Sequence, residues 1–243
     1  MKIFANPFRF ALLALALPTA LTFSSCDDDD ETPPQQGKVL ISHAAASANV
    51  QVKALVNDTE VGQLNYGQSS NYLNVNVGSP TLKINNSAGQ TAISKVVTIE
   101  QGKNYSVFAF APTATTVDLL PVVDDLSAPA AGQAKIRVVH LGLGAPSPVK
   151  LSENSIAGLV DVAGISAAFP TASPFVSIPT GSRNLIITTG SPSTQVIAVG
   201  DGTGTGTGTK NYEAGKIYTI VVRGIASNFD QTLQPRAVIV ANN

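Results

Sequence analysis

The chain has 243 residues, of which 44% are hydrophobic, 13% are charged and 6% are aromatic, and its formal net charge is −1. This length allows one large or two small domains, and the near-neutral charge gives no basic footprint for nucleic acid. The single cysteine excludes a disulfide within the chain. Few charges combined with many β-branched residues, 20 Gly and 15 Pro favour all-β extracellular modules.

Residues 1–25 show the three parts of a secretory signal peptide. Lys2 and Arg9 supply positive charge, residues 10–17 form an apolar run, and a short stretch of mostly small residues follows. The apolar run is far shorter than the roughly 20 residues that a transmembrane helix needs. We therefore predict a cleaved signal peptide over residues 1–25 and no membrane-spanning segment.

Cys26 follows two small residues, Ser24 and Ser25, as a lipoprotein processing site requires. Phe23 departs from the leucine usual at the third position before the cysteine. The site resembles those of Bacteroidetes-type lipoproteins, in which an acidic run after the cysteine is associated with export to the outer leaflet of the outer membrane. We predict that lipid on Cys26 anchors the protein to a membrane, since several acyl chains suffice for stable anchoring. The alternative is ordinary signal cleavage, which leaves a free thiol in the periplasm or outside the cell.

Residues 26–37 are predicted to form a disordered acidic tether, because five acids at 27–31 repel one another and nothing apolar follows them. The alternating oxygen ligands and glycine of a calcium loop are missing, so neither a metal ion nor another cofactor is expected. Without these five acids, Lys2 and Arg9, the chain holds 13 basic and 11 acidic residues. The acidity therefore belongs to the tether.

Residues 38–128 alternate between apolar and polar side chains, as β-strands do, and turn signals recur every 8–12 residues. This pattern is typical of a β-sandwich. The predicted strands are 39–43, 50–56, 73–77, 82–84, 96–99, 105–111 and 117–123.

A short segment, 126–132, leads to a second predicted β-sandwich over residues 133–243. Residues 155–168 are ambiguous and could hold a short helical turn. The predicted strands of this domain are 136–140, 175–178, 184–188, 195–199, 218–222 and 237–240.

The two predicted domains repeat three sequence blocks in the same order. KVLISH at 38–43 recurs as KIRVVH at 135–140, an offset of 97, and EQGKNY at 100–105 recurs as EAGKIY at 213–218, an offset of 113. Between them, Tyr66 and Tyr72 correspond to Phe169 and Phe175 at an offset of 103. We interpret the chain as two tandem copies of one module.

The run DGTGTGTGT at 201–209 is an insertion in the second copy. It lacks the Gly-x-x-x-x-Gly-Lys-Ser/Thr pattern of a phosphate-binding loop. We predict a flexible hairpin loop, and expect that deleting residues 202–209 leaves stability nearly unchanged, because loop length affects stability only weakly.

These blocks resemble the family called domain of unknown function 4397. The resemblance rests on the strand ending in Val-Val-His at 138–140, the aromatic-x5-aromatic step from Phe169 to Phe175, and AGKIYT at 214–219. The first copy departs from the pattern at Ser42 and Ser106. The resemblance implies tandem immunoglobulin-like sandwiches on an envelope protein, with no established activity.

Groups suited to catalysis or metal binding do not converge in the sequence. His43 and His140 are repeat-equivalent, lack other metal ligands at suitable spacing, and are expected to bond loop backbone at a strand end. No Gly-x-Ser-x-Gly elbow is present. Asp124 and Asp125 are expected to form a solvated strand end.

Four aromatic residues are weak candidates for a ligand-binding platform: Tyr66, Tyr72, Phe169 and Phe175. The second copy keeps the rings and loses both hydroxyls, a change that core packing tolerates. Core packing is therefore favoured for these four residues.

The sequence favours a non-enzymatic lipoprotein of the cell envelope, lipid-anchored in the outer membrane and facing outward. Its two sandwiches would act as a structural, adhesive or spacer module with an unknown protein or glycan partner. The alternative is a glycan- or peptide-binding accessory lipoprotein of a nutrient-uptake system.

Overall fold

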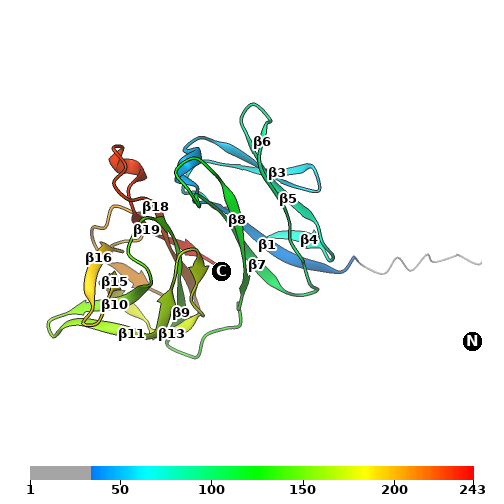
Figure 1. The fold of residues 1–243 in the computed structure, drawn as a ribbon. Helices are drawn as coiled ribbons and strands as arrows, with labels where there is room; N and C mark the ends of the chain where they lie inside the picture. The colour runs from blue at the N-terminus through cyan, green and yellow to red at the C-terminus, as the bar shows by residue number, and fades with distance from the viewer. Residues whose placement is uncertain (1–33) are drawn as a thin grey trace, which may run out of the picture. The chain divides into compact units, whose positions relative to one another are not determined.

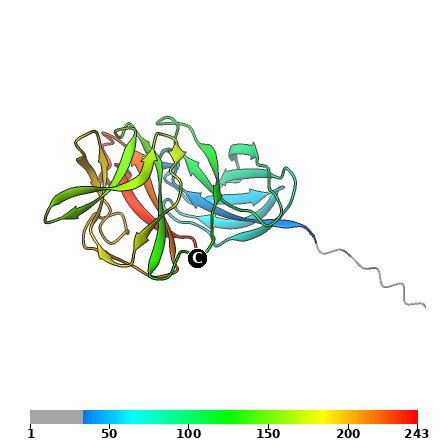
Figure 2. The same cartoon turned by 90° about the horizontal axis from the view of Figure 1, so that it is seen from below.

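The structure, a computed structural model, describes residues 34–243. The fold is all-β, as predicted, with strands β1–β19 and two short 3₁₀ turns in these residues (Figures 1 and 2). The predicted signal peptide and Cys26 lie outside the described residues. The predicted tether ends earlier than expected, because Gln36 and Gly37 already belong to β1. Within residues 34–243, no helix has the length and hydrophobicity to cross a membrane.

The first half of these residues contains two four-stranded sheets, in the orders β4-β1-β7-β8 and β3-β2-β5-β6. One apolar core takes Ile41 and Val107 from the first sheet and Val52 and Ile84 from the second, so the two sheets form a sandwich. The elements are β1 (Gln36–His43), η1 (Ala46–Ala48), β2 (Val52–Val56), β3 (Thr59–Leu64), β4 (Leu73–Asn76), β5 (Thr81–Asn86), β6 (Thr91–Val96), β7 (Asn104–Phe110) and β8 (Asp118–Asp124).

The second half repeats this arrangement with sheets β12-β9-β18-β19 and β11-β10-β15-β16. A second core joins Ile136 and Ile220 to Leu151 and Ile187. The elements are β9 (Gln133–Leu143), β10 (Val149–Ser155), β11 (Gly158–Ala167), β12 (Thr171–Ala172), β13 (Val176–Pro179), β14 (Gly181–Arg183), β15 (Leu185–Thr189), β16 (Thr194–Ala198), β17 (Lys210–Tyr212), β18 (Ile217–Ile225), η2 (Gln231–Leu233) and β19 (Arg236–Ala241).

The repeated Glu-x-Gly-Lys-x-Tyr block has the same structural role in both halves. The Tyr105 hydroxyl accepts a hydrogen bond from the Glu100 backbone N–H at 3.1 Å, and the Tyr218 hydroxyl accepts from Glu213 N–H at 3.2 Å. Each tyrosine thus closes the turn that leads into its strand, much as a tyrosine corner does in immunoglobulin-like sandwiches.

Two of the sheets are buried on both faces. Along β7, Val107 and Ala109 point into the first sandwich core, whereas Phe108 and Phe110 belong to a third apolar cluster. That cluster also contains Val139 and Leu141 of β9, Val221 of β18 and Val238 of β19, and it joins the two halves. The central strands therefore read as continuous apolar runs.

Residues 155–168 contain no helical turn. They close a hairpin between β10 and β11, the yellow-green strands labelled in Figure 1. The long, mostly exposed β11 explains the ambiguous sequence, since an edge strand with few buried side chains shows little apolar alternation.

The Gly-Thr run is packed, and the prediction of an unpacked, flexible loop is wrong. Gly202 and Gly204 are buried, while Thr203, Thr205 and Thr207 are exposed. The Gly202 carbonyl accepts a hydrogen bond from Ile239 N–H of β19 at 2.8 Å. The alternation of Gly and Thr lets the backbone lie directly against β19.

Candidate functional site

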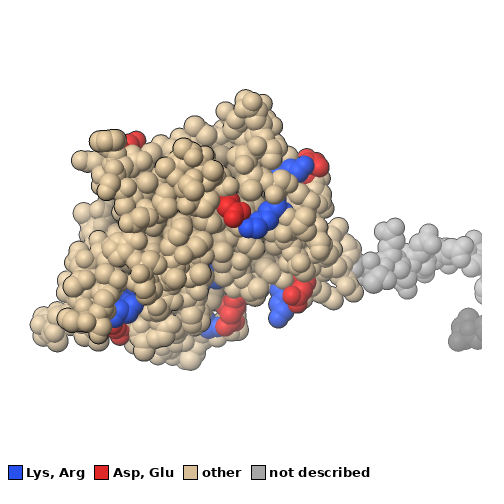
Figure 3. Space-filling model, in the orientation of Figure 1, with Lys and Arg blue, Asp and Glu red and all other residues tan. Residues whose placement is uncertain are grey.

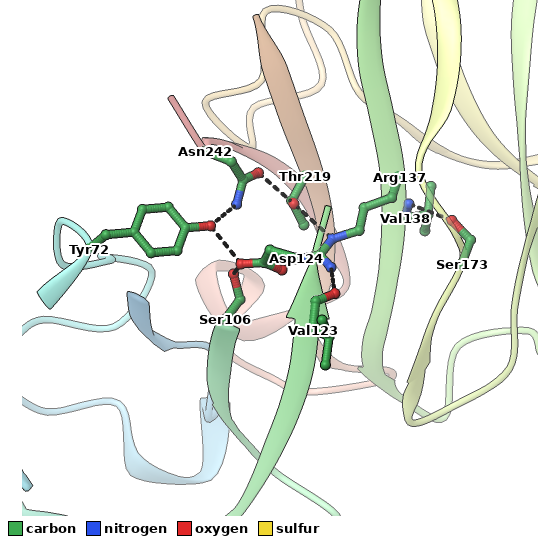
Figure 4. A network of polar contacts seen from close by, with 9 residues as sticks. All are labelled: Tyr72, Ser106, Val123, Asp124, Arg137, Val138, Ser173, Thr219 and Asn242. Atoms are coloured by element: carbon green, nitrogen blue, oxygen red, sulfur yellow. Dashed lines mark hydrogen bonds and ion pairs between the residues drawn. The ribbon is translucent and has the colours of Figure 1, made fainter. Parts of the chain in front are cut away.

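A buried network of six polar side chains crosses the junction between the two halves (Figure 4). We call it the junction network. The first half contributes one residue each from β7 and β8 and the residue just before β4. The second half contributes one residue each from β9 and β18 and the residue just after β19. Its members are Tyr72, Ser106, Asp124, Arg137, Thr219 and Asn242.

Asp124 is the centre of this network. Its Oδ1 lies 2.5 Å from Nη2 of Arg137, and both side chains are almost completely buried, at 0% and 1% exposed. Its Oδ2 accepts hydrogen bonds from the Tyr72 hydroxyl at 2.5 Å and from Ser106 Oγ at 2.7 Å. The expectation that Asp124 is solvated is wrong, whereas Asp125 is exposed. The difference arises because the second half covers the end of β8.

The second half completes the bonding. Arg137 Nε donates to Thr219 Oγ1 at 3.0 Å, and Thr219 donates to Asn242 Oδ1 at 2.7 Å. Asn242 Nδ2 then donates to the Tyr72 hydroxyl at 2.9 Å. The Arg137 guanidinium also lies 4.4 Å from the centre of the Phe175 ring. Removing one partner of such a buried ion pair would be strongly destabilising, because it leaves the other charge buried and uncompensated.

Burial shifts the pKa values of two members of this network, Arg137 and Tyr72. Burial lowers the pKa of Arg137, and Asp124 opposes that shift. Burial, followed by the charge of Asp124, raises the pKa of the Tyr72 hydroxyl well above its usual value of 10.0. The phenol therefore acts as a fixed hydrogen-bond donor at neutral pH.

Two aromatic contacts flank the junction network. In the first, His43 meets Tyr66 edge-on at 5.8 Å between ring centres, and the Arg223 guanidinium lies 4.1 Å from the Tyr66 ring centre. In the second, Phe169 meets His140 at 5.8 Å and Phe110 at 6.0 Å, again edge-on.

Both histidines bond loop backbone at the end of a strand. His43 Nε2 lies 3.0 Å from the Ala48 carbonyl oxygen, and His140 Nε2 lies 3.1 Å from that of Pro146. Burial lowers both histidine pKa values below 6.5, so both rings are neutral at pH 7. The histidines therefore fix the loops that follow β1 and β9.

The four predicted platform aromatics all lie at the junction. Tyr66 and Phe169 form the flanking contacts, Tyr72 is a member of the junction network, and Phe175 borders it. Asp124, Arg137, Thr219 and Asn242 were not predicted as site residues. One signal was available: Arg137 interrupts the apolar stretch 136–139 of β9, where an unpaired charge would be costly.

A second polar cluster lies on the outer sheet of the second half. Lys150 Nζ is 2.7 Å from Asp161 Oδ2 and donates to Ser193 Oγ at 2.9 Å. Ser152 donates to Asp161 at 2.6 Å, and hydrogen bonds to Lys150, Ser152 and Ser193 lower the pKa of Asp161 to about 2. Among residues 34–243, no three His, Cys, Asp or Glu side chains are grouped to hold a metal ion.

An open depression of about 350 Å³ lies beside the Gly-Thr run, lined among others by Thr205, Gln231, Gln234 and Arg236. Elsewhere, Figure 3 shows a face on which charged side chains are sparse and lie mostly beside a charge of opposite sign. The ion pairs of the described residues include Lys135 with Asp125 and Arg183 with Glu153.

The family model described as "Domain of unknown function (DUF4397)" matches residues 37–148. This segment is similar to that family, which confirms the resemblance seen in the sequence. A comparison with curated proteins gives no match.

Two solved structures show distant similarity. The Bacillus anthracis TIE protein is 11% identical, with a TM-score of 0.25 over 78% of this chain and 34% of the other. A leucine-rich repeat protein from Bacteroides thetaiotaomicron VPI-5482 is 12% identical, with a TM-score of 0.19 over 79% of this chain and 26% of the other. The chain thus spans about a third and a quarter of the lengths of these proteins.

Proposed function

We propose that this protein is a cell-envelope lipoprotein, held in the outer membrane by lipid on Cys26 and facing outward. In this proposal the 34–243 unit serves as a non-enzymatic structural, adhesive or spacer module. The observation that carries the proposal is the position of Cys26, between the signal-like residues 1–25 and the acids at 27–31.

The length of the tether supports a role close to the membrane. Pro34, the first described residue, is eight positions after Cys26. Even a fully extended segment of that length reaches only about 28 Å. The lipid would therefore hold the unit near the bilayer, with its two joined sandwiches extending the reach.

The polar side chains of the unit support a non-enzymatic role because they bond to one another. The junction network uses its carboxylate, guanidinium and phenol within the fold. The Lys150–Asp161 pair likewise holds its neighbouring serines. These are stabilising arrangements, in which each reactive group already has a partner.

Lipidation and location are tested on the full chain in its native host. Wild-type protein should partition into a detergent phase, incorporate labelled fatty acid and be digested by protease added to intact cells. Cys26→Ala should lose the label and the detergent partitioning. Wild-type protein that carries no lipid would overturn the anchor, and protection from protease until lysis would overturn the outward orientation.

The second candidate is a glycan- or peptide-binding accessory lipoprotein of an uptake system. The observation in its favour is the open polar depression beside the Gly-Thr run, because amide and hydroxyl side chains suit sugar hydroxyls. A glycan array with residues 34–243 distinguishes the two functions. Binding that is lost in Gln231→Ala with Gln234→Ala, but kept in the distant exposed variant Gln63→Ala, would favour this candidate.

A further inference from the structure

Strand register aligns the two halves residue by residue along the junction. Lys38 of β1 pairs with Asn104 of β7, and their equivalents Lys135 and Ile217 pair in the same way. The alignment extends to side-chain bonds: Ile41 N–H donates to Ser70 Oγ at 2.9 Å, and the equivalent bond joins Val138 to Ser173 at 3.0 Å.

The same alignment makes Asp124 equivalent to Asn242. Asp124 lies opposite Asn104 in β8, and the Asn242 backbone N–H bonds to the carbonyl of Ile217, the equivalent of Asn104. Their side chains also have equivalent donors, because Ser106 donates to Asp124 and Thr219 donates to Asn242, both at 2.7 Å. The junction network is therefore built from one set of positions used twice.

The flanking contacts are reciprocal. Phe110 of the first half packs on Phe169 of the second. The equivalent of Phe110 at the offset of 113 is Arg223 of the second half, and it packs on Tyr66, the equivalent of Phe169. A contact from residue i to j that is matched by one from j to i is the property of an isologous, two-fold interface.

One charge pair breaks this symmetry. The first half has the acidic Asp124 where the second half has the neutral Asn242. The second half has the basic Arg137 where the first half has the apolar Leu40. Pairing two first halves would bury two aspartates without a cation, and pairing two second halves would bury two arginines without a carboxylate. Buried unpaired charges of this kind are strongly unfavourable.

We propose that the junction is a pseudo-two-fold interface between two copies of one module, in which the face of each copy is occupied by the other copy of the same chain. The shared aromatic and apolar positions supply the contact area, and the Asp124–Arg137 pair selects first-to-second docking over pairing of like copies. Within one chain, segment 126–132 keeps the effective concentration high, so the internal pairing prevails.

The first experiment removes the covalent link from the full chain. A specific protease site replaces residues 127–131, and the cleaved protein is passed through a size-exclusion column at micromolar concentration. We expect the two fragments to elute together at the size of the uncut protein. Separation of the fragments, folded or unfolded, would show that the face does not dock copies by itself.

The second experiment tests the equivalence of positions 124 and 242. Asp124→Asn leaves Arg137 without its carboxylate, and Asn242→Asp places two carboxylates around one guanidinium, so each should lower the melting temperature by about 10 °C. The double variant exchanges the two side chains, so the network again holds one carboxylate for Arg137. Arg137 is linked to position 242 because it donates to Thr219, which in turn donates to the side chain at 242. We expect it to recover more than half of the summed loss.

Asp125→Asn is the matched control, because Asp125 is adjacent but exposed. Its melting temperature should stay within about 2 °C of wild type. A double variant whose loss equals the sum of the two single losses would reject the equivalence of the two positions. That outcome would leave the network as an ordinary buried cluster.

Discussion

At the scale of single residues, buried polar side chains bond the backbone of the loops that follow their strands. His43 and His140 are both buried, neutral and bonded to loop carbonyls. Burial is the first cause of the lowered pKa in each, and Arg223 adds a smaller repulsion at His43. The protonated ring is therefore favoured in the unfolded chain rather than in the folded one.

The lowered histidine pKa values predict that stability falls on acidification. Each pKa is below 6.5 in the folded state, so the contribution is complete above pH 6.5 and is lost as pH falls through the folded value. The free energy of unfolding should fall as the pH drops below 6.5, by at most about 1.4 kcal/mol per pH unit for each histidine. Urea titrations at pH 7, 6 and 5 measure this slope.

His140→Gln is the informative variant for this slope, since glutamine can still donate to the Pro146 carbonyl but does not titrate. Its slope below pH 6.5 should be smaller than that of wild type, because only His43 then contributes. An unchanged slope would mean that His140 binds its proton equally well in the folded and unfolded states.

At the scale of elements, the Gly-Thr run shows how a low-complexity sequence can be structural. A Cβ on Gly202 would lie 2.6 Å from Ile239 Cδ1, and a Cβ on Gly204 would lie 2.8 Å from Val238 Cγ1. Both glycines have positive φ, at +86° and +92°. Only glycine fits at these two positions, so the Gly-Thr run packs directly against β19.

Gly202→Val should therefore destabilise the protein by about 3 kcal/mol, through overpacking against Ile239 and an unfavourable positive φ. Thr205→Val, on the exposed side of the same run, should change stability by no more than about 0.5 kcal/mol. Chemical denaturation of both variants makes the comparison. Equal stabilities for the two would show that the run does not hold its position against β19 in solution.

At the scale of the whole molecule, the third apolar cluster couples the two sandwiches. Phe108 and Phe110 of β7 are buried together with Val139, Leu141 and Val221 of the second half. Either half alone would expose this face and the junction network. The free energy of each sandwich is therefore tied to the presence of the other.

This coupling predicts one cooperative thermal transition for residues 34–243. In scanning calorimetry, the calorimetric and van't Hoff enthalpies should agree. Phe110→Asp places a charge in the third cluster while leaving the first sandwich core untouched, and should split the transition in two. Two separate transitions in the wild-type protein would contradict the coupling.

Much of the fold was predictable, because alternation with a period of two reports local burial. The first strand, the Tyr105 and Tyr218 strands and the fold class follow from this pattern. The edge strands β3 and β11 were missed, since their exposed side chains carry little apolar signal. The inner strand β10 was also missed, and the strand predicted at 96–99 overlaps β6 only at Val96.

The junction was harder to predict because its residues have other plausible uses. Tyr66 and Phe169 suit a ligand platform, a core or an interface equally well, and Asp124 beside Asp125 reads as a solvated pair. Only the packing of the second half against β8 distinguishes these two aspartates. That packing depends on contacts between residues far apart in the chain.

The sequence by itself determined the all-β class, the position of most strands, the repeated blocks and the family resemblance. These follow from local periodicity and from motifs that are contiguous in the chain. The tertiary structure alone decided that the aromatics join the halves, that Asp124 is buried against Arg137, and that the Gly-Thr run is packed. The physical reason is that burial of a second sheet face depends on which distant surface covers it, and a local pattern carries no record of that partner.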